Sequence, residues 1–244
     1  MKFKSILLAA GLLWAGLAQA DTVALWGFNQ VGVNAQNQPV YSTKPTYTDH
    51  GGAFLDTLGV STTFVSQSGS SDTTGGSMAL NTAGYASQGT GDRTTGVQFS
   101  IDTTGFQDIV LTFDQRNSAT ASAWTALLYT IDGENWVEAT TFRMLRDSAF
   151  VKGLGFNFSD IAGVDDNANF AVQLVSMFAP GTQAYAGTGG NYGTGGTIRY
   201  DMVQFAGSLI PEVDVPEVPE PASIALAVVA LGAMGLSIRR RKQA

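Results

Sequence analysis

The side chains that are able to do chemistry are few in this sequence, and none lies in a recognised catalytic motif. There is one histidine, His50, and no cysteine. A Ser-His-Asp triad would have to use His50, yet it stands in the turn-like segment 48–52, and no G-x-S-x-G motif is present. The H-E-x-x-H signature of zinc hydrolases is absent as well. We interpret His50 as a turn residue, and the lack of cysteine excludes thiol catalysis and thiolate zinc sites.

Carboxylates are plentiful, and a suitably spaced pair of them would hydrolyse a glycosidic bond. The candidates are Asp114, Glu134, Glu138, Asp147 and Asp160. None of them lies in a recognisable motif, and Glu134 falls in a predicted exposed turn. The glycine-rich runs are not followed by Gly-Lys-Ser/Thr, so they form no phosphate-binding loop. The sequence therefore predicts no catalytic residues and a protein that is not an enzyme.

The charge distribution argues against nucleic acid as a partner. Six of the 13 basic residues lie close to the two ends of the chain, whereas all 20 acidic residues lie between Asp21 and Glu220. The body between the ends thus combines 7 basic with 20 acidic residues. A strongly negative surface repels phosphate backbones. We expect a soluble, secreted body that binds no nucleic acid.

The N-terminal residues 1–20 are typical of a secretory signal peptide. Lys2 and Lys4 provide the basic region, and Ile6 to Leu17 forms an apolar run. Ala18-Gln19-Ala20 then offers small residues at the two positions that signal peptidase reads. We predict cleavage between Ala20 and Asp21. The alternative is an uncleaved anchor helix.

The C-terminal residues fall into three parts. The tetrapeptide Val218-Pro219-Glu220-Pro221 comes first, after a proline- and acid-rich linker that begins at residue 211. An uncharged apolar stretch covers 222–238, and as a helix it would span about 25 Å, enough for a thin hydrocarbon core. A basic cluster, Arg239, Arg240, Arg241 and Lys242, follows within the final segment 239–244. Basic residues stay on the cytoplasmic side, so we predict a transmembrane helix with the body outside the cytoplasm.

This arrangement resembles the PEP-CTERM sorting tail of Gram-negative bacteria. The resemblance implies that an exosortase, a membrane-bound processing enzyme, cuts at or near Pro219-Glu220-Pro221. It also implies an intermediate tethered to the inner membrane and a product at the cell surface or outside the cell. Proteins with such tails typically accompany exopolysaccharide and biofilm matrix. The alternative is a plain single-pass anchor with a proline-stiffened stalk.

The body, residues 21–210, shows alternation of apolar and polar side chains with a period of two, as half-buried strands do. No segment of it keeps a helical period, and turn-forming residues separate the alternating stretches. The sequence predicts an all-β fold, an antiparallel β-sandwich or jelly roll. The predicted strands are 22–28, 62–66, 77–86, 97–101, 109–113, 122–131, 135–143, 154–158, 170–174 and 198–205.

One predicted hairpin joins 124–131 to 136–142 through the turn pair Asp132-Gly133. Its sequence YTIDGENW resembles hairpins of exported β-sandwich modules related to carbohydrate-binding domains, and the body resembles jelly-roll domains found on PEP-CTERM proteins. Such domains often hold a structural calcium between the first strand and an aspartate of the last. That resemblance implies Asn29 and Asp201 as calcium ligands. The alternative for Asp201 is an ion pair with Arg199 or with an arginine of a neighbouring strand.

Three further features leave alternatives open. The cluster Asp165-Asp166-Asn167 lacks the spacing of an EF-hand and is interpreted as an acidic turn. The glycine-rich segment 181–197 is a long crossover loop, or else a binding loop in which Tyr185 and Tyr192 stack on a ligand. The tryptophans of the predicted strands are expected in the core; they are Trp26, Trp124 and Trp136.

The main hypothesis from the sequence is a non-enzymatic envelope or matrix protein linked to exopolysaccharide or biofilm. Its partners would be signal peptidase, an exosortase, the membrane during processing, and an exopolysaccharide. The leading alternative is a carbohydrate-binding module for the secreted polysaccharide, and a secreted hydrolase ranks third. No cofactor is predicted apart from the structural calcium.

Overall fold

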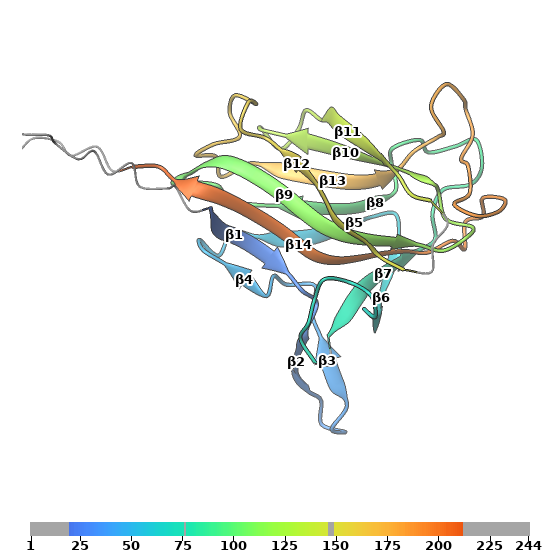
Figure 1. The fold of residues 1–244 in the computed structure, drawn as a ribbon, viewed down its shortest axis with the longest axis horizontal. Coiled ribbons are helices and arrows are strands. Elements are labelled where there is room, and N and C mark those ends of the chain that lie inside the picture. The colour runs from blue at the N-terminus through green and yellow to red at the C-terminus, as the bar shows by residue number, and fades with distance from the viewer. Residues whose placement is uncertain (1–19, 76, 146–148, 212–244) are drawn as a thin grey trace, which may run out of the picture. The chain divides into compact units, whose positions relative to one another are not determined.

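The computed structural model describes residues 20–75, 77–145 and 149–211, and these residues form an all-β fold without a helix, as predicted (Figure 1). All described strands lie in the compact unit that ends at Ile210. Among the described residues, no helix is long and apolar enough to cross a membrane. The predicted signal-peptide core, sorting motif 218–221, membrane helix 222–238 and basic cluster 239–242 lie outside the described residues. Ala20 is exposed, and Asp21 opens the first strand.

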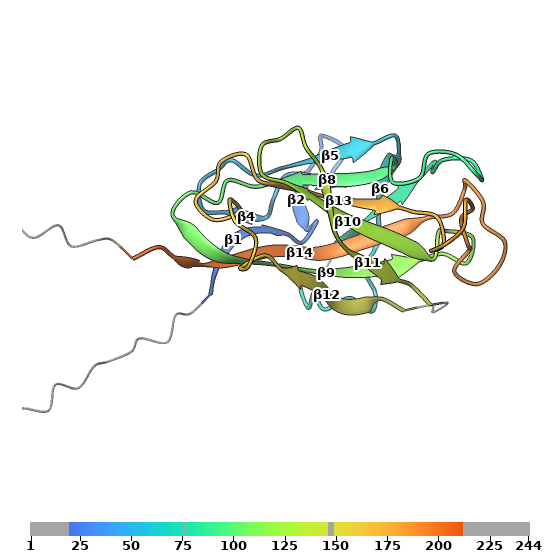
Figure 2. The same cartoon turned by 90° about the horizontal axis from the view of Figure 1, so that it is seen from above.

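Two antiparallel sheets pack face to face as a sandwich (Figures 1 and 2). The five-stranded sheet has the order β11-β10-β13-β8-β5. Its strands are β11 (Val137–Arg143), β10 (Trp124–Thr130), β13 (Ala171–Ser176), β8 (Gly96–Ser100) and β5 (Phe54–Leu58).

The seven-stranded sheet has the order β12-β9-β14-β1-β4, and β7 joins β14 to β6. Its strands are β12 (Val151–Asn157), β9 (Phe106–Asn117), β14 (Ile198–Leu209), β1 (Asp21–Trp26), β4 (Tyr47–Thr48), β7 (Met78–Ala83) and β6 (Ser61–Ser66). Along one edge, β14 pairs first with β7 and then with β1. Along its other edge, where β14 pairs with β9, the register shifts between Asp201 and Gln204. A β-bulge of this kind bends a strand, so β14 serves two neighbours in turn.

A short hairpin of β2 (Gln30–Val33) and β3 (Pro39–Tyr41) projects from the sandwich (Figure 1). Together with β4 and β5 it occupies the region between residues 30 and 58, where the sequence predicts no strand. These strands are short, and those of the hairpin are largely exposed, so they lack the alternation by which buried strands are found.

The core between the sheets consists of the inward residues of both. Phe113 and Phe205 from the seven-stranded sheet, and Phe99 from the five-stranded sheet, are almost fully buried. Trp26 is fully buried, packs edge-on against Phe99 at 4.9 Å between ring centroids, and donates its indole N–H to the Thr43 carbonyl. Its predicted place in the core is confirmed.

The predicted hairpin is confirmed, with β10 paired antiparallel to β11. Gly133 has a φ of +80°, a conformation that glycine adopts without steric cost. The Asp132 carboxylate accepts hydrogen bonds from the backbone N–H groups of Glu134 and Asn135. The side-chain amide of Asn135, which donates to Asp132 Oδ2 at 2.6 Å, and then these backbone N–H groups hold the pKa of Asp132 well below its usual range, so the turn is locked by an ionised side chain. The expected exposure of Glu134 is confirmed.

Candidate binding face of the five-stranded sheet

The outer face of the five-stranded sheet carries the strongest candidate for a ligand site. Side chains alternate along each strand, and residues directly opposite each other in paired strands point to the same face. Phe99 points into the core, so its neighbours Gln98 and Ser100 point outward. The register then brings two rows of outward residues together. One row runs Thr130, Ala171, Ser100, Phe54, and the next runs Glu138, Leu128, Gln173, Gln98, Asp56.

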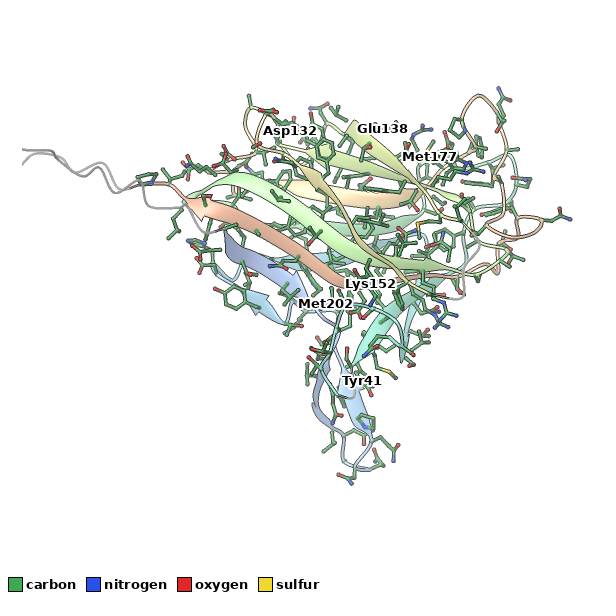
Figure 3. The ribbon with its side chains drawn as sticks, viewed as in Figure 1. Tyr41, Asp132, Glu138, Lys152, Met177 and Met202 are labelled. Carbon is green, nitrogen blue, oxygen red and sulfur yellow. The ribbon has the colours of Figure 1, made fainter. Side chains whose placement is uncertain are left out.

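One end of this face is closed by side chains. A second apolar cluster lies there, separate from the inter-sheet core: Ala126, Leu128, Val175 and Met177, with Leu58, Trp124 and Trp136 packed against them. Arg93, which donates its backbone N–H to Ser176 at the end of β13, reaches Glu138 on β11 with 2.7 Å between Nε and Oε2. This ion pair therefore crosses β10. Figure 3 shows Glu138 and Met177 on this sheet, and Lys152 and Met202 on the other.

The other end of the face is open and holds a pocket of about 330 Å³. Phe54 on the edge strand β5 and Trp136 at the base of the β10–β11 hairpin both line it. Phe54 is 53 % exposed, which is unusual for a phenylalanine, and Trp136 is half-buried. The strand spacing places β5 and β10 about 14 Å apart. Two aromatic rings thus flank a shallow floor made of small and polar residues, among them Ser100 and Ala171.

Two polar groups of the floor, Gln98 and Ser100, are joined to Gln173 of the neighbouring strand in one chain of hydrogen bonds. Gln173 donates its Nε2–H to Gln98 Oε1 at 2.9 Å, and Gln98 donates its Nε2–H to Ser100 Oγ at 3.4 Å. Each side chain keeps a further donor or acceptor, because an amide and a hydroxyl offer more groups than this chain uses. The Asp56 carboxylate is exposed at the end of the same row. The floor therefore presents alternating donors and acceptors at positions held by the sheet.

Such a surface suits a ligand with apolar faces and many hydroxyl groups. Aromatic rings bury the apolar faces of a ring-shaped ligand, and a few placed polar groups set its orientation. The row is nearly uncharged, because Glu138 is paired with Arg93 and only Asp56 carries a free charge.

The tryptophans predicted in the core divide between two places. Trp26 lies between the sheets, whereas Trp124 and Trp136 pack in the outer cluster and are half-buried. The expectation of core burial is wrong for these two. Alternation along a strand shows which residues share a face of the sheet. It does not show which of the two faces packs in the core between the sheets.

Tyr185 and Tyr192 stack on each other, with ring centroids 4.4 Å apart. The Tyr185 hydroxyl donates to the Gly91 carbonyl at 2.7 Å, and the Tyr192 hydroxyl donates to the Ala86 carbonyl at 2.6 Å. Burial raises the pKa of Tyr192 to about 12. The two rings therefore fasten the glycine-rich loop to the segment before β8, and the interpretation as ligand-stacking groups is wrong.

His50 lies in a bend, with its Nδ1 3.1 Å from Asp49 Oδ2 and its ring edge-on to Phe106, as predicted for a turn histidine. The acidic cluster is also a structural turn. Asp165 and Asp166 accept hydrogen bonds from the backbone N–H groups of Asp108 and Gly105. Asn167 donates to the carbonyls of Ile131 and Gly163.

Asp201, a predicted calcium ligand, is fully buried and lies opposite Asp114 on β9. Its carboxylate accepts hydrogen bonds from Ser70 Oγ at 2.6 Å and from the Met202 N–H at 2.9 Å. Burial raises the pKa of Asp201 to about 7, against these bonds, and the carboxylates of Asp72 and Asp114 raise it too. The alternative of an ion pair with an arginine is wrong, because none of the ion pairs among the described residues involves Asp201.

Asn29, the second predicted ligand, has a buried Oδ1 with no hydrogen-bond partner. An orphaned carbonyl oxygen of this kind is a suitable calcium ligand. Both oxygens of Asp201 are already engaged, however, and the described residues contain no group of three or more acidic, histidine or cysteine side chains placed to hold a metal. The donor set in the described part of the chain thus fits calcium only at Asn29.

Comparison with known proteins identifies the tail. Residues 217–242 match the PEP-CTERM protein-sorting motif, which confirms the resemblance drawn from VPEP, the apolar stretch and the basic cluster. The motif indicates a secreted protein that is processed at the membrane. No curated protein matches the chain.

Among solved structures, the chain is similar to a family 29 carbohydrate-binding module complexed with mannohexaose, with 13 % identity over 77 % of this chain and 92 % of that one and a TM-score of 0.42. It is also similar to the Clostridium thermocellum xylanase 10B modules CBM22-1 and GH10 complexed with xylohexaose, with 10 % identity over 80 % of this chain and 30 % of that one and a TM-score of 0.45. At these identities the likeness is one of β-sandwich fold alone.

Proposed function

We propose that this chain is an exported, non-enzymatic envelope or matrix protein whose β-sandwich binds a polysaccharide through the outer face of the five-stranded sheet. The observation that carries this proposal is the pocket between Phe54 and Trp136, with its floor of joined amide and hydroxyl groups. Phe54 and Trp136 would bury the apolar faces of sugar rings, and the amide and hydroxyl groups between them would set the orientation of the polymer.

The sorting motif supports the rest of the proposal. Signal peptidase would release the N-terminus at Ala20–Asp21, and an exosortase would act near Pro219-Glu220-Pro221 on a membrane-tethered intermediate. The product would stay at the cell surface or in the matrix, where an exopolysaccharide is the abundant ligand. The intact mass of the protein recovered from the cell surface tests this path, because a chain that still contains Arg239 to Ala244 would contradict it.

Glycan binding is tested with the full chain kept in a non-ionic detergent, on an array of neutral and acidic polysaccharides. Binding to at least one polymer is expected, and the Phe54→Ala variant should lose it. Tyr47→Ala is the matched control, because Tyr47 is also an exposed aromatic residue, at 46 %, but lies on β4 of the other sheet. The proposal fails if no polymer binds, or if both variants bind as the native chain does.

The non-enzymatic part of the proposal rests on the lack of a catalytic constellation in the sequence and in the described residues. The exposed carboxylate of the face, Asp56, is not joined there by a second free one, since Glu138 is held by Arg93. A screen of polymer substrates for released reducing ends should show no turnover by the full chain.

A structural calcium held by Asn29, with Asp201 as the second predicted ligand, is a further proposal, and only the orphaned Asn29 Oδ1 supports it. A ligand that binds only the folded state raises the melting temperature by mass action. Melting curves with calcium and with a chelator should then differ, and Asn29→Ala should remove the difference. Identical curves would retire this proposal.

A further inference from the structure

We propose that Arg116 and Arg199 form a binding site for an oxyanion, a carboxylate or phosphate group, on the outer face of the seven-stranded sheet. This site is separate from the glycan-binding face, which lies on the other sheet, and it does not depend on the proposed function.

The two arginines are direct cross-strand neighbours. Arg199 on β14 lies opposite Arg116 on β9 and, on its other side, opposite Asn81 of β7. Asn81 in turn lies opposite Thr63 of β6 and donates its Nδ2–H to Thr63 Oγ1. Residues opposite each other share a face, so these four side chains form one row. It consists entirely of groups that are able to donate hydrogen bonds.

Neither guanidinium has a carboxylate partner among the described residues. The ion pairs among the described residues join other groups. Within the described part of the chain, the Arg199 guanidinium donates only one long hydrogen bond, 3.5 Å, to the Ser66 carbonyl, and the Arg116 guanidinium makes none. Burial, and then the charge of Arg116, lower the pKa of Arg199. The pair is therefore half-buried and like-charged, and it has no acidic partner in the part of the chain that the structure describes.

The nearest acids do not neutralise this pair. Asp114 and Asp201 stand two residues away on the same two strands, but the segment after β6 covers them. Asp114 accepts hydrogen bonds from the backbone N–H groups of Ser71 and Gly153, and Asp201 accepts from Ser70 and Met202. Their oxygens are engaged, so they are not available to the arginines.

Like charges placed directly opposite each other destabilise a sheet, and such local conflicts are expected where a site serves a ligand. Two guanidinium groups offer paired, parallel N–H donors that match the oxygens of a carboxylate or phosphate. The strongly acidic body repels densely charged polymers. An isolated oxyanion on an otherwise neutral molecule is therefore the ligand class that fits.

The test uses melting curves of the full chain in non-ionic detergent with rising concentrations of inorganic phosphate or glucuronate, and with glucose as the uncharged control. We expect at least one anion to raise the melting temperature of the native chain. The same anion should leave the melting temperature of the Arg116→Gln/Arg199→Gln double variant unchanged. A larger response to phosphate or to glucuronate identifies the source of the oxyanion. Lys44→Gln, which removes an exposed cation elsewhere, should respond as the native chain does. Equal shifts in native and double-variant chains, or no shift with either anion, would overturn the proposal.

Two more variants separate binding from a structural role. Without anion, Arg199→Gln should raise the melting temperature by about 1–3 °C, because it relieves the like-charge pair. A lower melting temperature would mean that the arginines neutralise the negative charge of Asp114 and Asp201, and it would contradict the proposal. Arg116→Lys keeps the charge but loses the planar donor pair, so it should weaken anion binding on the order of tenfold. Phe54→Ala should leave the anion response intact.

Discussion

Two rows of outward side chains cross the sandwich, one on each sheet. On the five-stranded sheet the row is Glu138, Leu128, Gln173, Gln98 and Asp56, whereas on the seven-stranded sheet it is Arg116, Arg199, Asn81 and Thr63. The first row is close to neutral and lies beside exposed aromatic rings; the second is cationic and has none. The same antiparallel geometry thus presents two chemically different rows, because the sheet sets only the positions of the side chains and the sequence sets their chemistry.

The acids of the two faces differ even more. Asp56 is exposed to solvent, whereas Asp114 and Asp201 are buried under the segment that follows β6. A buried carboxylate beside a second one is costly unless it takes up a proton. This difference leads to the largest effect that we expect from a single substitution.

Asp201→Asn should stabilise the protein at pH 8 by about 2–4 kcal/mol, since the amide resembles the protonated acid. The folded pKa of Asp201, about 7, exceeds its unfolded value. Stability from this group is therefore complete at low pH and is lost as the pH rises through about 7. Urea unfolding between pH 4 and 8, with chelator present, should show this loss in the native chain and a flatter profile in the variant. The same slope in both chains would refute the assignment.

Trp136→Ala and Phe54→Ala should each weaken glycan binding on the order of tenfold or more, through the loss of buried aromatic area. Titration calorimetry with the polymer found on the array measures this. Only Trp136→Ala should also lower the melting temperature, because Trp136 packs against the outer cluster and Phe54 is half exposed. Unchanged affinity in both variants would remove the pocket as the site.

Gln98→Ala should weaken glycan binding about fivefold, a loss typical of one neutral hydrogen bond. Gln204→Ala is the matched control on the seven-stranded sheet, where Gln204 donates to Thr22. It should leave glycan affinity unchanged. If Gln98→Ala and Gln204→Ala weaken glycan binding equally, the two faces are not distinct in function.

Glu138→Gln should have the smallest effect, less than about 1 kcal/mol on stability, because the Arg93–Glu138 pair is partly exposed and screened by solvent. The difference in free energy of unfolding between the native chain and the variant should be smaller in high salt than in low salt. A loss of several kcal/mol would show that the pair holds the closed end of the face together.

The fold could be predicted largely from the sequence because its long strands alternate. The central segments 109–113 and 198–205 fall within β9 and β14, and segment 97–101 overlaps β8, which ends at Ser100. The edge strands between residues 30 and 58 could not be predicted, since they are short and largely exposed and so show no alternation of apolar and polar residues. The proposed glycan-binding site could not be predicted from the sequence either. Phe54 lies in one of these edge strands, and nothing in the sequence around Trp136 indicates that its side chain is partly exposed.

The sequence by itself determined the sorting motif and the all-β class, and it predicts the signal peptide. Signal, sorting motif and strand period are properties of neighbouring residues, and each is complete within a short segment. Tertiary structure alone decided which side chains meet. It set Gln98 beside Gln173, Arg116 beside Arg199, and Asp114 beside Asp201. The physical reason is register: pairing between distant strands assigns every side chain its face and its neighbour, and a shift by one residue would exchange them.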